Sequence, residues 1–103
     1  MANYLLLYSG GGTPDGEAEQ AKVMQAWNEW FGALGEALVD GGNPFSGQTK
    51  TIGMDRSVSD GGFDASGYSV IKAASIEEAT EKAKGCPVLR GGAKITVYET
   101  FAM

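Results

Sequence analysis

The residue with the clearest chemical potential in this sequence is Asp60, which opens the segment Asp60-Gly61-Gly62-Phe63. A carboxylate at the mouth of a pocket can act as a general base or orient a ligand. The same Asp-Gly-Gly pattern also forms turns, because Asp bonds nearby backbone N–H groups and Gly accepts positive φ. Asp60 therefore has two interpretations, a catalytic carboxylate or a turn residue.

Four aromatic residues and one cation are the candidates for binding a substrate beside Asp60: Tyr8, Trp30, Arg56, Phe63 and Tyr68. Tyr8 ends and Tyr68 begins a predicted strand. A buried tyrosine needs a partner for its hydroxyl group, so each either points into a polar pocket or packs in the core. Trp30 is offset from the apolar stripe of its predicted helix, which suits a cavity wall or a subunit interface.

Composition argues against several other chemistries. The sequence has no histidine and one cysteine, Cys86, and its carboxylates do not cluster at metal-ligand spacing, so we expect no metal and no cofactor. Cys86 has no histidine to activate it and is expected to pack beneath a helix end. Ser9-Gly10-Gly11-Gly12 lacks the register of a phosphate-binding loop. The formal net charge of −5 disfavours nucleic-acid binding.

The elements that would position these residues follow the order β-α-β, insert, β-α-β. Strands are predicted at residues 3–8, 37–39, 68–73 and 93–99. A hairpin around Met54-Asp55-Arg56 lies within the insert at 43–66. One helix ends at Leu34 and begins near Pro14 or Glu17, with Thr13 as its cap. The second begins after Ser75 and ends before Gly85.

This order predicts an α+β protein with a ferredoxin-like βαββαβ fold, an antiparallel sheet and both helices on one face. Residues 1–103 form one domain in this interpretation. The long helix should bury a stripe of Met24, Trp27, Phe31 and Leu34. One cysteine, no signal peptide and no long apolar run predict a cytoplasmic protein that does not cross a membrane.

The first and third strands are apolar on both sides, but the predicted helices cover only one face of the sheet. A second copy packed against the open face would solve this problem. The sequence therefore predicts a homodimer that associates sheet against sheet.

The ordered motifs resemble those of the YCII-related, or DGPF, family of small bacterial proteins. The matching pieces run through the whole chain: Tyr4-Leu5-Leu6-Leu7-Tyr8, Met24…Trp27…Trp30, Leu38-Val39-Asp40-Gly41-Gly42 with Pro44, Asp60-Gly61-Gly62-Phe63, Gly67-Tyr68, Ser75-Ile76-Glu77-Glu78-Ala79, Cys86-Pro87 and Gly91-Gly92. The resemblance implies a dimeric α/β barrel, a superfamily that includes small monooxygenases and isomerases.

The chain departs from that family at two points. Gly62 replaces the proline of the DGPF signature, and the His–Asp pair suspected of catalysis in smaller members is absent, since the chain has no histidine. Two functions from different classes are therefore expected. The first is a homodimer with a small-molecule pocket near Asp60 and no assigned reaction. The second is a regulatory or accessory module that binds a protein, such as a sigma factor, without catalysis.

Overall fold

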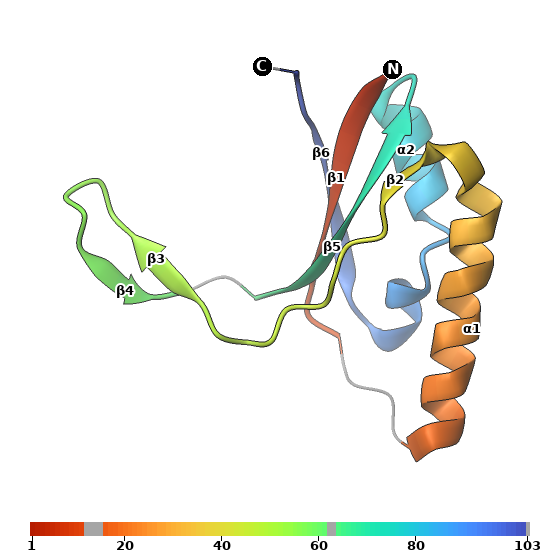
Figure 1. Ribbon diagram of the computed structural model, residues 1–103, viewed down its shortest axis with the longest axis horizontal. Helices are drawn as coiled ribbons and strands as arrows, with labels where there is room; N and C mark the ends of the chain where they lie inside the picture. Colours follow the sequence, from red (N-terminus) through yellow and green to blue (C-terminus); the bar gives the residue numbers. More distant parts are fainter. Residues whose placement is uncertain (12–15, 62–63, 103) are drawn as a thin grey trace.

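A four-stranded antiparallel sheet carries the fold (Figure 1). The computed structural model describes residues 1–11, 16–61 and 64–102. Along the chain its elements are β1 (Ala2–Ser9), α1 (Gly16–Leu34), the 3₁₀ turn η1 (Gly35–Ala37), β2 (Leu38–Asp40), β3 (Lys50–Ile52), β4 (Val58–Asp60), β5 (Ala65–Ala73), α2 (Ile76–Ala83), the 3₁₀ turn η2 (Pro87–Gly91) and β6 (Lys94–Glu99).

The strands of the main sheet lie in the order β2-β5-β1-β6, and every neighbouring pair is antiparallel. β1 is a central strand that pairs with both β5 and β6. The chain is therefore α+β, as predicted, and its arrangement is compatible with a ferredoxin-like fold.

Both helices pack against one face of this sheet (Figure 1). Alternation along β1 explains how: Tyr4, Leu6 and Tyr8 are buried beneath the helices, whereas Leu5 and Leu7 point to the other face and are half-buried. Successive strand residues face opposite sides, so a strand rich in leucine and tyrosine presents apolar groups to both.

The long helix buries a stripe that is rotated slightly from the predicted one: Leu34 is buried and Trp27 and Phe31 pack against the core, as predicted, but Met24 does not. Ala26, Trp30 and Leu34 are its buried residues, whereas Met24 is 61% exposed and Trp27 is only partly buried. The indole N–H of Trp30 donates to the backbone oxygen of Lys82 at 3.1 Å, near the end of α2. Trp30 is thus the core tryptophan, which reverses the expected roles of the two indoles.

The predicted ends of the helices are confirmed where they can be seen. Gly35 follows α1 with φ of +54°, and the Ser75 hydroxyl group accepts a hydrogen bond from the Glu78 backbone N–H at 3.1 Å. The predicted cap at Thr13 lies outside the described residues. Ala79 and Ala83 of α2 are buried in the core, whereas Ile76 in its first turn is 41% exposed.

The insert forms the predicted hairpin, in which β3 and β4 pair only with each other. It projects away from the main sheet (Figure 1). Its tip is closed by a hydrogen bond from the Gly53 N–H to the Ser57 carbonyl, and Arg56 adopts φ of +68°. Ile52, Met54 and Val58 are exposed along this arm.

The sheet face opposite the helices is lined by half-buried or exposed apolar groups. In the strand register, Val70, Leu5 and Tyr98 form one row across β5, β1 and β6. Tyr68 pairs with Leu7 in the next row and stacks on Phe45, with ring centroids 5.9 Å apart. None of the described helices covers this surface, which is called the open face below. No helix in the described ranges has both the length and the apolar character needed to span a bilayer.

Candidate functional site

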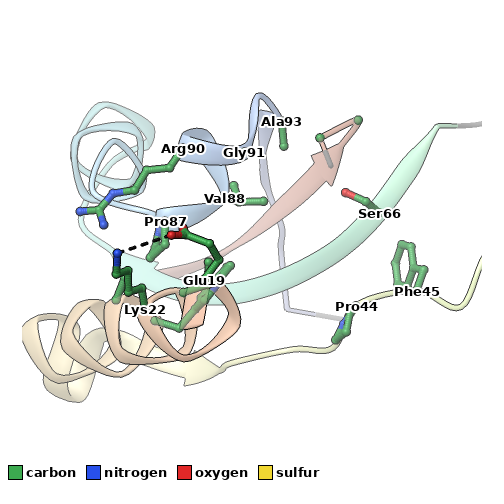
Figure 2. Close-up of a pocket in the computed structure, with 15 residues that line it drawn as sticks. Glu19, Lys22, Pro44, Phe45, Ser66, Pro87, Val88, Arg90, Gly91 and Ala93 are labelled. Carbon is green, nitrogen blue, oxygen red and sulfur yellow. Dashed lines mark hydrogen bonds and ion pairs between the residues drawn. The ribbon is translucent and has the colours of Figure 1, made fainter. Parts of the chain in front are cut away.

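A cleft of about 750 Å³ opens between the first half of α1 and the segment around η2 (Figure 2). α1 contributes Glu19, Lys22, Val23, Ala26 and Trp27. The η2 segment contributes Pro87, Val88, Arg90, Gly91 and Ala93, and the rest of the lining is Gly10, Gly11, Pro44, Phe45 and Ser66. This volume is in the usual range of small-molecule sites.

The apolar wall of the cleft is anchored by Trp27. Its ring lies 5.8 Å from that of Tyr8, 5.7 Å from that of Trp30 and 5.5 Å from that of Phe31, measured between centroids. Edge-to-face and tilted aromatic contacts at these separations are favourable and hold the rings in place. Trp27 therefore joins a fixed aromatic cluster while also lining the cleft.

Across the cleft from α1, the backbone of Gly11 packs closely against Ala93. Gly11 has φ of +87°, and a Cβ atom added there would lie 3.0 Å from the Cβ of Ala93. The preceding residue, Gly10, donates its backbone N–H to the Asp64 carbonyl at 3.0 Å. The positive φ therefore favours glycine at position 11, and the Cβ of any other residue would also be in tight contact with Ala93.

One end of the cleft carries charged groups. Lys22 Nζ lies 3.4 Å from Glu19 Oε1, and both side chains are largely exposed. Arg90 lines the same cleft, and within the described part of the chain it has no ion-pair partner. Figure 2 draws Arg90 and Lys22 at one end of the cleft, with Phe45 and Ser66 at the other.

A chain of buried hydrogen bonds runs behind the aromatic wall. The Cys86 thiol donates to the Tyr8 hydroxyl group at 3.6 Å, Tyr8 donates to Ser69 Oγ at 2.7 Å, and Ser69 donates to the Gly41 carbonyl at 2.8 Å. Burial raises the pKa of Tyr8 and of Cys86 above their ordinary values. Both groups are therefore protonated at neutral pH, as their donor roles require.

Three of the site residues predicted from the sequence lie on or near the main sheet. Tyr8 is buried with its hydroxyl group on Ser69, and Trp30 is buried with its N–H on Lys82. Tyr68 faces the open side of the sheet and stacks on Phe45. None of these three lines the cleft, although Tyr8 contacts Trp27, which does.

The other predicted residues lie in the arm or beyond the described residues. Asp60 ends β4, its side chain is 88% exposed, and its carboxylate lies 2.8 Å from Lys50 Nζ. Arg56 is at the tip of the same hairpin. Phe63 lies outside the described residues. The structure therefore does not bring Asp60 or Arg56 to the cleft, and the described Asp60 contact is an exposed ion pair.

Lys22, Trp27 and Arg90 are the cleft residues that sequence reasoning missed. Helical spacing places four of the cleft residues on one face of α1: Glu19, Lys22, Val23 and Ala26. Their spacing in the sequence could have identified this face as a second functional surface of the helix. Arg90 gave no local signal, because only the fold places η2 opposite α1.

Within the described residues, no group of three or more His, Cys, Asp or Glu side chains could hold a metal ion. The chemistry available at the cleft is thus that of an apolar aromatic wall and a few charged groups at one end. Comparison with protein-family models and with curated proteins finds no match to this sequence.

Proposed function

We propose that the protein binds a small organic molecule in the cleft between α1 and η2. The observation that carries this proposal is a cleft of about 750 Å³ with an apolar wall fixed by Trp27 and charged groups at one end. Small-molecule sites typically combine such an apolar lining with a few polar groups that orient the ligand. The proposed binding site is thus this cleft, whereas the sequence predicted a pocket near Asp60.

We assign binding and no reaction. Cys86 and Tyr8, which have nucleophilic and acid–base potential, do not line the cleft; they are buried and hydrogen-bonded to each other. Burial holds the thiol in its protonated form by raising its pKa, and a thiol is a much weaker nucleophile than a thiolate.

A cleft-filling substitution tests the proposed site. Val23 lines the cleft and is only partly buried, so Val23→Trp should fill the space with little loss of stability. Met24→Trp is the matched control, because Met24 is the next residue on α1, is exposed and does not line the cleft. A fragment library would be screened against all three proteins by thermal shift and by ligand-observed NMR.

We expect fragments that bind the wild type and Met24→Trp to lose binding to Val23→Trp. Equal binding to all three proteins would place the ligands elsewhere and contradict the proposal. So would a screen in which no fragment binds the wild type.

We further propose that two copies associate through the open face, as expected for the dimeric α/β barrels that the sequence resembles. Support comes from the apolar row of Val70, Leu5 and Tyr98 across the open face, and from Tyr98 being 49% exposed in the isolated chain.

Light scattering after gel filtration should give twice the 10.7 kDa chain mass. Tyr98→Lys should give a monomer, whereas Ile76→Lys on α2 should not; a monomeric wild type at micromolar concentration would refute the dimer.

A second candidate function is protein binding through the arm. Ile52, Met54 and Val58 are exposed apolar side chains on an isolated hairpin, and such hairpins are marginally stable alone. A partner protein that covers them would stabilise the arm. Purified wild-type protein should then retain a partner that Ile52→Asp loses, and recovery of the same proteins with both would contradict this function.

A further inference from the structure

We infer that the molecule held in the cleft is an organic monoanion, with a flat apolar body against Trp27 and a single carboxylate toward Arg90 and Lys22. This inference rests on the proposed function, because it names the ligand class of the same cleft. Arg90 is the residue to which we assign recognition of the charge.

The charge balance of the chain supports an anion at this position. The protein as a whole is acidic, with a formal net charge of −5. Four of its lysines, Lys22, Lys50, Lys82 and Lys84, lie within 4.0 Å of carboxylates. Among the described residues that line the cleft, Arg90 and Lys22 are accompanied by one carboxylate, that of Glu19, and Arg90 has no ion-pair partner in the described part of the chain. This part of the lining therefore carries an excess of one positive charge.

The shape of the guanidinium group suits a carboxylate. Arginine presents several N–H donors in a planar fork, which can hold both oxygens of one carboxylate. Within the described residues, the Arg90 side chain makes no hydrogen bond that a ligand would have to break.

The layout of the cleft separates the charged end from the aromatic end. Arg90 and Lys22 lie at one end in Figure 2, Phe45 lies at the other, and Val88 and Pro87 lie between. A ligand along this axis places its charge at the first end and its apolar body in the middle. An inorganic anion would use only the first end and would leave the apolar wall without a role.

Glu19 limits the charge of the ligand. Its carboxylate lines the cleft and pairs with Lys22 at 3.4 Å, so an incoming anion meets one negative group as well as two positive ones. Because both members of that pair are exposed, the pair is weak. One negative charge on the ligand would balance the charged side chains of the described lining, whereas two or three would exceed their net charge.

The test uses two probes that share a ring system and differ in charge. 2-Naphthoate carries a carboxylate, and 2-naphthamide carries a neutral amide of nearly the same size. Isothermal titration calorimetry of the full chain at neutral pH and low salt gives Kd for each. We expect naphthoate to bind about fivefold more tightly than naphthamide, a modest factor because Arg90 is exposed.

Three variants locate the origin of the difference. Arg90→Gln should raise Kd for naphthoate most of the way to that for naphthamide, with Lys22 accounting for the remaining preference, and should leave Kd for naphthamide unchanged. Lys84→Gln removes the same charge at the end of α2, outside the cleft and the open face, and should change neither value. Glu19→Gln should tighten naphthoate binding by about twofold to threefold, because it removes a repulsive carboxylate and releases Lys22.

The outcomes separate this inference from the proposed function. If both probes bind equally well and both lose affinity in Val23→Trp, the cleft is a binding site but the anion assignment is wrong. If Arg90→Gln and Lys84→Gln weaken naphthoate binding equally, the effect is one of net charge, and the assignment to Arg90 is wrong. If neither probe binds the wild type while fragments of the library do, this inference fails and the proposed function stands; if no fragment binds either, both fail.

Discussion

Replacing Ser69 by alanine should destabilise the protein far more than the loss of one small hydroxyl group suggests. Ser69 is fully buried in β5, accepts a hydrogen bond from Tyr8 and donates one to the Gly41 carbonyl. The variant loses both bonds and leaves the buried Tyr8 O–H and the part-buried Gly41 C=O without those partners.

The expected cost can be worked from these contacts. Each lost hydrogen bond contributes about 1 kcal/mol net, and a buried polar group left without a partner costs about 1–3 kcal/mol. We expect Ser69→Ala to lower the free energy of unfolding by about 3 kcal/mol, or roughly 10–20 °C in Tm for a chain of this size. Tyr8→Phe should cost less, about 1–2 kcal/mol, because Ser69 keeps its bond to Gly41.

The assay is urea unfolding followed by circular dichroism, at one protein concentration for all variants because association would affect stability. Ser66→Ala is the matched control: it makes the same chemical change on the same strand, and the Ser66 hydroxyl group has no hydrogen bond within the described residues. A Ser69→Ala cost below about 0.5 kcal/mol, or below that of Tyr8→Phe, would refute the role given to this chain of bonds.

Three further predictions concern the same region. The buried Cys86 thiol, with its raised pKa, should react with iodoacetamide only as fast as the protein opens, so denaturant should accelerate labelling strongly. Above about pH 10 the unfolded chain loses the Tyr8 proton while the folded chain keeps it, so stability should fall by up to about 1.4 kcal/mol per pH unit, and urea titrations of Tyr8→Phe should show a shallower fall. Gly42→Ala should lower Tm severely, because Gly42 has φ of +76° and an added Cβ would overlap the Tyr68 carbonyl oxygen; an unchanged Tm would contradict this.

Local sequence signals were sufficient for most of the secondary structure. The Ser75 cap, Gly35 after α1 and the apolar run of β1 each act within a few residues, so the sequence alone could predict them. The hairpin was predictable for the same reason, since residues 53–57 form its turn with their own hydrogen bonds.

The orientation of α1 could not be predicted in the same way. Trp27 and Trp30 are both compatible with an apolar stripe, and helical spacing does not decide which one faces the core. The decision depends on the acceptor that the Lys82 carbonyl offers to the Trp30 indole, and 52 residues separate that pair in the sequence. An interaction of such range leaves no periodic signal.

The candidate site was hidden for a related reason. The cleft exists because η2 and α1 pack on the same face of the sheet, which brings Arg90 and Lys22 to one lining. Asp60 was predicted as a site residue because Gly61 and Gly62 follow it. The same residues also suit the end of a hairpin, where Asp60 forms an exposed ion pair with Lys50.

The central position of β1 has a consequence for synthesis of the protein. Tyr8 and its partner Ser69 are 61 residues apart, and Tyr4 and its partner Glu99 are 95 apart. At about 5–20 residues per second, a ribosome needs roughly 3–12 s after making Tyr8 to reach Ser69. During that interval the segment Tyr4–Tyr8 has no strand to pair with. We therefore expect this apolar stretch to be the part of the nascent chain that chaperones bind first, and the part that aggregates when translation stalls before β5.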